Sequence, residues 1–298
     1  MSGLSSNVTD TALLLEGGGM RASYTSGLVV ALLEAGIHLD WVGGISAGSS
    51  NTANYLSRDA DRARRSFTDF AADPKFGNVR TFVRGEGLFN ARYIYQEAGL
   101  PGQALAFDWG TYAANPARFR IGGFNATTGQ QVHWGREDVT DIHDLMIRVQ
   151  ASSTMPILMP PVTIDGQVYV DGALGPAGGI PLDAARADGY GRFLAVLTRE
   201  RSYVKPPQAA EWFFRRHFRR YPAVAEALMH RPERYNATRA ELFELERQGA
   251  AYLFVPEQMP VGNGERHVGK LAASHRAGLA QARREIPAIR DFLGLATR

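Results

Sequence analysis

The first feature of this 298-residue chain that suggests chemistry is a serine between two glycines, Gly44-Ile45-Ser46-Ala47-Gly48. The pattern G-x-S-x-G is typical of a nucleophile elbow, where a strand reverses into a helix and presents the serine hydroxyl at the tip of the turn. Glycines on either side leave room for close backbone contacts and strained dihedral angles. The hydroxyl would also lie near the positive end of the following helix. A plain glycine-rich turn gives the same pattern, so Ser46 is a candidate nucleophile that needs partners.

A glycine-rich loop precedes this serine, at Gly17, Gly18 and Gly19. It follows a continuous apolar run, residues 11–15, which is typical of a strand buried on both faces of a parallel sheet. It precedes residues 22–34, whose apolar positions have helical spacing. Backbone N–H groups at the start of a helix have no partner within it, so such a loop is suited to hold an anion.

Two kinds of anion fit this loop. With Ala22 in the last position, the loop matches the dinucleotide-binding pattern G-x-G-x-x-G/A. It also matches an oxyanion hole, whose amides face the negative oxygen of a tetrahedral acyl intermediate. A dinucleotide site needs an acidic residue after the next strand, but that strand, which begins near Trp41, leads to Ser46. We therefore favour the oxyanion hole. Arg21 either holds a substrate phosphate or fixes the loop, and both interpretations stay open.

An aspartate at the end of a later strand is the candidate base. Residues 162–164 and 167–170 are predicted to form a hairpin, because the Asp-Gly pair at 165–166 is a favoured two-residue turn. Asp171 follows directly and precedes a glycine, so its simplest role is to cap that turn. A serine hydroxyl is a poor nucleophile until a base takes its proton. An aspartate can be that base for Ser46 if burial raises its pKa.

Two other hypotheses remain. The chain order Ser46, Asp171 and then His267 or His275 is compatible with the triad of an α/β-hydrolase. Against this, the elbow here follows the second predicted strand, whereas in α/β-hydrolases it lies deeper in the sheet. The remaining alternative is a non-catalytic protein whose glycine loop binds a nucleotide or a lipid head group. The histidines show no metal-ligand spacing, so we expect no metal and no organic cofactor.

Composition narrows the class of protein. The chain has no cysteine, which excludes disulfides, thiolate metal sites and a cysteine nucleophile. Its start is small and polar, unlike a signal peptide, and no apolar run approaches the ~18 residues of a membrane span. These signals favour a cytoplasmic protein. The net charge is +3, and four arginines gather in residues 215–220, so peripheral contact with an anionic membrane surface stays open. We expect no nucleic-acid partner, and the oligomeric state cannot be predicted.

The chain divides into a flexible N-terminus at residues 1–9, an α/β core at 10–200 and a mostly helical extension at 201–298 that packs on the core. The extension is predicted to contain helices at 209–220, 223–229, 232–248 and 269–293, the last of them one helix or two. Residues 211–221 contain Trp212, Phe213, Phe214 and Phe218 alongside four arginines. Such a helix can lie on a lipid surface, but we favour a helix that packs its aromatic residues on the core.

Four motifs occur in one order, and together they resemble the patatin-like phospholipases, in particular the bacterial branch with a helical C-terminal extension. They are Gly17-Gly18-Gly19-x-Arg21, Gly44-x-Ser46-x-Gly48, Ala151-Ser152 with Pro156, and Asp171-Gly172-Ala173. The resemblance covers residues 13–197 well. It implies a three-layer α/β/α fold with a mostly parallel central sheet.

The same resemblance implies a function. Ser46 would be the nucleophile and Asp171 the base of a Ser–Asp dyad, with an oxyanion hole from the Gly17, Gly18 and Gly19 amides. The reaction would be hydrolysis of lipid acyl esters, without a cofactor. One departure is Ala22, where the family usually has glycine, and we expect a methyl group to be tolerated at the start of a helix.

Overall fold

A central sheet organises the fold. The computed structural model describes residues 4–77 and 89–296, and within them the sheet has eight strands. Seven follow the order β5-β6-β3-β2-β1-β7-β8, and β4 also pairs with β3. Strands β3, β2, β1, β7 and β8 are parallel, whereas β4, β5 and β6 form antiparallel pairs at the β3 end. The strands are β1 (Ala12–Leu15), β2 (Trp41–Ile45), β3 (Arg118–Asn125), β4 (Gln131–Trp134), β5 (Val162–Ile164), β6 (Gln167–Asp171), β7 (Phe193–Val196) and β8 (Ala251–Phe254).

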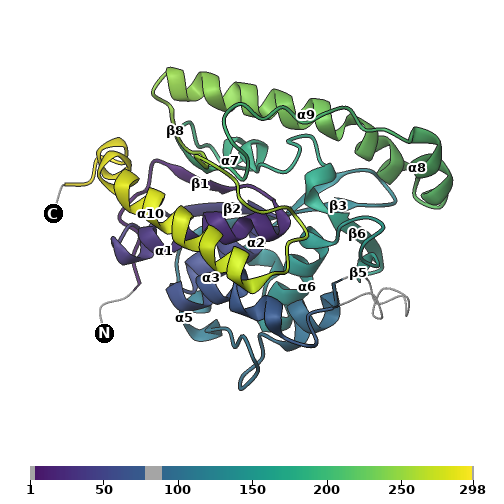
Figure 1. The fold of residues 1–298 in the computed structure, drawn as a ribbon, viewed down its shortest axis with the longest axis horizontal. Helices are drawn as coiled ribbons and strands as arrows, with labels where there is room; N and C mark the ends of the chain where they lie inside the picture. Colours follow the sequence, from purple (N-terminus) through teal and green to yellow (C-terminus); the bar gives the residue numbers. More distant parts are fainter. Residues whose placement is uncertain (1–3, 78–88, 297–298) are drawn as a thin grey trace.

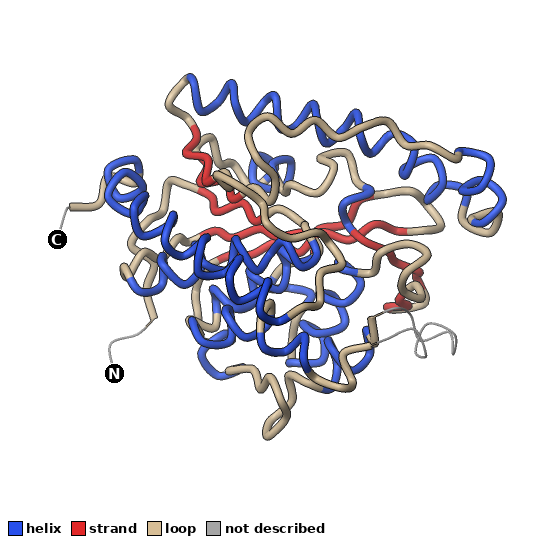
Figure 2. Tube along the Cα trace, viewed as in Figure 1, coloured by secondary structure: helices blue, strands red, loops and turns tan. Residues whose placement is uncertain are grey.

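Helices cover both faces of this sheet, with α9 on one side and α1, α2, α3 and α10 on the other (Figures 1 and 2). The α-helices are α1 (Ala22–Glu34), α2 (Ala47–Leu56), α3 (Ala60–Ser66), α5 (Trp109–Ala114), α6 (Ile142–Ser153), α7 (Leu182–Ala187), α8 (Glu211–His217), α9 (Pro222–Arg247) and α10 (Val268–Phe292). Short helical turns are η1 (Gly19–Arg21), η2 (Asp69–Ala72), η3 (Tyr93–Glu97, a π-helix), η4 (Arg136–Asp138) and η5 (Gly172–Leu174).

The buried strand β1 explains why two helical layers are needed. Its side chains alternate between the faces of the sheet. Leu13 and Leu15 join the core beneath α1, α2 and α10, while Leu14 joins the core beneath α7 and α9. All three are at most 1% exposed. The predicted α/β fold with a mostly parallel sheet and a helical C-terminal region is confirmed.

Most predicted elements lie where the sequence places them, but the break at Pro232 is wrong. Helix α9 runs continuously from Pro222 to Arg247 with Pro232 inside it. A proline in a helix interior removes one hydrogen bond and strains the turn before it. Contacts on both sides of the proline hold this helix straight across the sheet: Arg231 Nε donates to the Ala173 carbonyl at 3.1 Å, and the Tyr235 hydroxyl donates to Glu16 at 2.8 Å.

The two ends of the chain are also attached to the core. At the N-terminus, Val8 is buried and forms a bridge with Leu39; residues 1–3 lie outside the described part of the chain. At the C-terminus, α10 packs closely along α1. A Cβ atom built on Gly278 would lie 2.0 Å from the Tyr24 carbonyl oxygen, so the two helix backbones approach to a distance that only glycine permits. No helix among residues 4–77 and 89–296 is long and apolar enough to span a membrane.

The close approach of α1 and α10 predicts that Gly278→Ala destabilises the fold. In an exposed helix this change stabilises by about 1 kcal/mol, but here overpacking opposes it by about 1–3 kcal/mol or more. We expect a lower midpoint of thermal unfolding. Gly110→Ala in α5 is the matched control, because its added Cβ meets only the Asp108 carboxylate at 3.5 Å. Equal melting temperatures for the two variants would contradict this packing.

Candidate active site

The structure brings Ser46 and Asp171 together. The Ser46 Oγ donates a hydrogen bond to the Asp171 Oδ2 at 2.8 Å, and each residue is 6% exposed. The two are separated by 125 positions in the chain. Their contact therefore depends on how the sheet is assembled.

Strand β3 explains how they meet. Ile45, the last residue of β2, pairs with Gly122, and Asp171, the last residue of β6, pairs with Gly123. Gly122 pairs with both β2 and β4, and Gly123 with both β4 and β6, so β2 and β6 share the edge of β3 opposite β4. The two strands run toward each other along this edge. Strand β2 ends opposite Gly122 and strand β6 ends opposite Gly123. Ser46, which follows β2, therefore lies beside Asp171, the last residue of β6.

The nucleophile elbow is strained as the sequence predicts. Ser46 has φ 56° and ψ −128°, a conformation that L-residues rarely adopt. A Cβ atom on Gly44 would lie 2.2 Å from the Gly48 carbonyl oxygen, and one on Gly48 would lie 2.0 Å from the Leu15 carbonyl oxygen. Both glycines are therefore steric requirements of the turn. Ser46 precedes α2, so its oxygen lies at the positive end of a ten-residue helix.

The glycine loop lies against this elbow. A Cβ atom on Gly17 would lie 3.0 Å from both the Ile45 carbonyl oxygen and the Ser46 Cβ. The Gly17 amide is already engaged, because it donates to the Gly179 carbonyl at 3.0 Å. The amides of Gly18 and Gly19 form no hydrogen bond with any other described residue. These two are the loop amides that remain for a ligand.

The remaining loop residues also have defined positions. Ala22 is fully buried at the start of α1, where its methyl group packs against Ala47 and Phe67, so the departure from glycine is accommodated. The side chain of Arg21 is buried and donates from Nε to the Thr198 carbonyl at 3.1 Å. This contact fixes the loop, which is one of the two roles that the sequence left open.

Two residues that hold the site were not assigned a role from the sequence. The Ser152 hydroxyl accepts a hydrogen bond from the Ser46 amide at 2.9 Å, and the Thr154 carbonyl accepts one from the Asp171 amide at 2.9 Å. Both lie at the end of α6. The pair Ala151-Ser152 was visible as a motif, but only the fold shows that its hydroxyl fixes the strained serine.

Asp171 both caps the turn that follows it and accepts a hydrogen bond from Ser46. Its Oδ1 accepts from the Ala173 amide at 2.9 Å, which caps η5, while Oδ2 accepts from Ser46. Burial raises the pKa of the Asp171 carboxyl above its ordinary value; the Arg231 charge and these two hydrogen bonds oppose that shift only in part. A carboxylate with a raised pKa is a stronger base, as deprotonation of a hydroxyl requires.

Neither C-terminal histidine lies at the dyad. His267 caps α10, where its side chain accepts from the Lys270 amide. His275 is buried between α1 and α10 with its Nδ1 2.8 Å from the Ser26 Oγ, and burial lowers its pKa to about 4. Among the described residues, no histidine forms a hydrogen bond with Ser46 or Asp171. The geometry therefore does not support the histidine triad.

An apolar cavity opens at the serine. It holds about 930 Å³ of empty space, a volume that includes its open mouth. Gly19, Ser46 and Ala47 line it at the glycine loop and the elbow, and other polar side chains in the lining are Ser50, Arg62, Ser66, Ser153 and Asn263. The rest of the lining is mostly aromatic and aliphatic: Met20, Phe67, Phe70, Phe76, Phe89, Ile94, Tyr95, Leu105, Phe107, Leu145, Met146, Val149, Met155 and Met159. Such a lining suits a long apolar group placed with its polar end at the serine.

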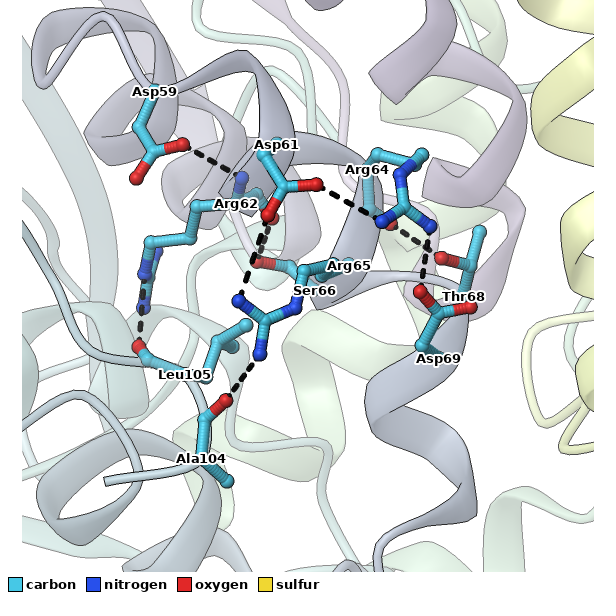
Figure 3. A network of polar contacts seen from close by, with 10 residues as sticks. All are labelled: Asp59, Asp61, Arg62, Arg64, Arg65, Ser66, Thr68, Asp69, Ala104 and Leu105. Atoms are coloured by element: carbon cyan, nitrogen blue, oxygen red, sulfur yellow. Dashed lines mark hydrogen bonds and ion pairs between the residues drawn. The ribbon is translucent and has the colours of Figure 1, made fainter. Parts of the chain in front are cut away.

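A polar network stabilises one wall of this cavity (Figure 3). The Asp59 carboxylate caps α3 by accepting from the Arg62 amide at 2.8 Å, and the Arg62 Nε donates to the Leu105 carbonyl at 3.1 Å. Arg65 reaches the neighbouring Ala104 carbonyl in the same view. These bonds attach α3 to the loop that supplies Leu105 and Phe107 to the lining.

Comparison with known proteins decides the family. The model of the patatin-like phospholipase family matches residues 13–186. The chain belongs to the patatin-like phospholipase family. A second model, a domain of unknown function (DUF6363), matches residues 221–294, which contain α9, β8 and α10.

Two individual proteins are similar to this patatin-like chain. The uncharacterized protein YjjU of Escherichia coli (strain K12) is 25% identical over 209 residues, which cover 68% of this chain. The match spans only 55% of YjjU. The crystal structure of VipD from Legionella pneumophila superimposes with a TM-score of 0.51 at 13% identity, covering 96% of this chain and 68% of VipD. At that identity, the likeness to VipD shows the fold alone.

The raised pKa of Asp171 predicts that Asp171→Asn stabilises the folded protein at neutral pH. A folded-state pKa above the unfolded value means that ionisation of the buried carboxyl opposes folding at pH values above that pKa. The effect disappears as the pH falls through the raised pKa to below the ordinary value of 3.8. We therefore expect the variant to melt at a higher temperature than the native chain at pH 8, and the difference to shrink toward pH 4. A variant that melts lower at pH 8 would contradict the desolvated carboxylate.

Proposed function

We propose that this chain is a serine acyl hydrolase that cleaves lipid acyl esters, with Ser46 as nucleophile and Asp171 as general base. The observation that carries the proposal is the 2.8 Å hydrogen bond from the hydroxyl of a strained serine to a buried carboxylate. That contact pairs a hydroxyl at the tip of the turn with an acceptor for its proton.

The reaction divides into two halves. In the first, Ser46 Oγ attacks the ester carbonyl while its proton moves to Asp171, and the protonated carboxyl then gives that proton to the leaving alcohol. The Gly18 and Gly19 amides supply hydrogen bonds to the oxyanion; Gly17 keeps its bond to Gly179. In the second half, Asp171 takes a proton from water as the water oxygen attacks the acyl-serine. The acid leaves, and the proton returns to Ser46.

The cavity supports a lipid as the substrate class. An acyl chain placed in the apolar cavity could bring its carbonyl to Ser46 and Gly19, which line the same cavity. Removing such a chain from water is favourable by about 0.8 kcal/mol for each methylene group. The same lining weakens the nucleotide hypothesis, because phosphates and ribose would find phenylalanine and methionine side chains beside the loop.

Substitution of the dyad tests this function. Ser46→Ala should reduce hydrolysis of a medium-chain ester to the uncatalysed background, because no oxygen remains to form the acyl intermediate. Asp171→Asn keeps the shape but cannot accept a proton, so kcat should fall by about 10²–10⁴-fold. Circular dichroism verifies that each variant is folded.

The control is His267→Ala, which removes an exposed helix cap and should leave kcat within about twofold of the native value. Near-native turnover by Asp171→Asn would contradict the dyad. Loss of turnover by folded His267→Ala would instead favour a histidine base.

We also propose peripheral contact with an anionic membrane through α8. The expectation that this helix packs its aromatic residues on the core is wrong for two of them: Trp212 is 74% exposed and Phe213 is 44% exposed, although Phe218 is buried. Beside them, Arg216, Arg219 and Arg220 form no ion pair with any described acidic residue. Exposed aromatic rings flanked by unpaired arginines match the chemistry of an anionic lipid surface.

Removal of the two exposed rings tests this contact. Trp212→Ser with Phe213→Ser should reduce co-sedimentation with vesicles of phosphatidylglycerol and phosphatidylcholine by at least tenfold. The control is Val204→Ser, a residue 71% exposed in the segment held on α9 near Asn236. Equal sedimentation of the two variants would contradict a role for α8.

A further inference from the structure

A second charged site lies behind the glycine loop, around the carboxylate of Glu16. This glutamate is 3% exposed and accepts three hydrogen bonds: from the Thr198 amide at 2.7 Å, the Thr198 hydroxyl at 2.9 Å and the Tyr235 hydroxyl at 2.8 Å. All three donors are uncharged. The carboxylate is therefore satisfied without a salt bridge, and it leaves the nearby positive side chains without a direct partner.

Four positive side chains, which we call the cation cluster, gather at this place: Arg21, Arg199, Lys205 and Arg231. They come from four parts of the chain: η1, the segment after β7, the segment before α8, and α9. Within residues 4–77 and 89–296, none of the four forms an ion pair. Two carboxylates act on the four positive charges, Glu16 among them and Asp171 beside Arg231, so positive charge remains in surplus.

The contacts of the cluster hold the charged groups in place without neutralising them. Arg21 Nε donates to the Thr198 carbonyl at 3.1 Å, and Arg231 Nε donates to the Ala173 carbonyl at 3.1 Å. The Lys205 Nζ lies 4.8 Å from the centroid of the Tyr235 ring. The backbone beside Lys205 is tied to α9, because its amide donates to Asn236 at 2.9 Å and its carbonyl accepts from the same side chain at 3.0 Å. These contacts fix the positions of the positive side chains before any ligand binds.

Burial and the nearness of like charges change the pKa values of two members of the cluster. Burial, together with the charges of Arg231 and Arg21, lowers the pKa of Lys205 to about 8. Burial also lowers the pKa of Arg21 to about 10, although Glu16 opposes the shift. Both shifts mean that the charged forms of these side chains are disfavoured at this place. A bound anion would stabilise them.

The cluster borders the dyad. Arg21 is two residues beyond Gly19, and Arg231 contacts the carbonyl two residues beyond Asp171. The charge of Arg231 acts on Asp171 directly. The apolar cavity is lined from the glycine loop, α2, α3 and α6, and none of the four cations lines it. Ser46 lines this cavity, and the cluster acts on its partner Asp171 through Arg231.

We propose that Arg21, Arg199, Lys205 and Arg231 form a subsite for a phosphate group, either the phosphate of a lipid head group or free phosphate. The assignment to a head group rests on the proposed esterase function, whereas the binding of phosphate does not. Arg199, Lys205 and Arg231 all lie beyond residues 13–186, the part matched by the patatin-like model. The C-terminal part of the chain therefore selects the substrate head group in addition to packing on the core.

Calorimetry on the full-length Ser46→Ala variant tests the subsite without any need for catalysis. Inorganic phosphate and glycerol 3-phosphate are titrated separately, and at least one should bind saturably. Adding Lys205→Met, which keeps the length of the side chain but removes its charge, should weaken binding about tenfold, the value expected for one charge-assisted hydrogen bond. Lys75→Met is the matched control, since Lys75 also lies over a tyrosine ring, 5.3 Å from the Tyr93 centroid, but outside the cluster.

A pH series separates binding by Lys205 from a merely structural role. The charged groups that act on it are Glu16, Arg21, Arg199 and Arg231, and the arginines keep their charge through pH 9. Phosphate binding favours the protonated lysine, so affinity should fall as the pH rises from about 8 to about 9, a range in which Arg21 stays mostly charged. Lys205→Met should remove most of that dependence, whereas Lys75→Met should retain it.

The outcomes are distinct. Binding of glycerol 3-phosphate that Lys205→Met weakens supports a head-group subsite. Binding of inorganic phosphate alone supports the anion site and overturns its assignment to a head group. If neither ligand binds, or if Lys205→Met and Lys75→Met bind equally well, the subsite is overturned. None of these results depends on ester hydrolysis, so a failure here is distinguishable from a failure of the proposed function.

Discussion

The site is organised around one hydrogen bond, between the hydroxyl of Ser46 and the buried carboxylate of Asp171. A carboxylate away from water is unstable unless it is protonated or well bonded, and a serine at positive φ is strained. Neither residue would adopt this state alone. Both are held by the surrounding chain: the Ser152 hydroxyl and two glycines fix the serine, while the Thr154 carbonyl and the Ala173 amide fix the aspartate.

The sheet supplies the geometry that this bond needs. Strands β2 and β6 end at adjacent positions on one edge of β3, one arriving parallel and the other antiparallel. A Cβ atom on Gly172, beside Asp171, would lie 2.2 Å from the Gly122 carbonyl oxygen, so a glycine here lets the end of β6 approach β3 closely. The antiparallel end of an otherwise parallel sheet is thus the feature that brings an aspartate, rather than a histidine, to the hydroxyl of Ser46.

Much of this could be predicted from the sequence, for physical reasons. The elbow, the glycine loop and the hairpin before Asp171 are local patterns, and steric limits on glycine and turn residues determine them within a few positions. The features that could not be predicted depend on contacts between residues that are far apart in the sequence. The engagement of the Gly17 amide by Gly179, the support of Ser46 by Ser152, and the continuity of α9 through Pro232 each require the assembled fold. The exposure of Trp212 and Phe213 is of the same kind, because a helix pattern does not specify which aromatic residues find a partner.

Labelling with a fluorophosphonate probe tests the activation of Ser46 most directly, because the probe reports nucleophilicity without depending on the identity of the lipid. If Asp171 is the base, intact-mass and peptide analysis should locate a single adduct on Ser46. Its rate should fall in acid with an apparent pKa above the ordinary aspartate value, since burial raises the pKa of Asp171. Labelling of folded Asp171→Asn should be slower by about 10²-fold or more. An adduct on another residue, or labelling of Asp171→Asn at the native rate, would contradict the dyad.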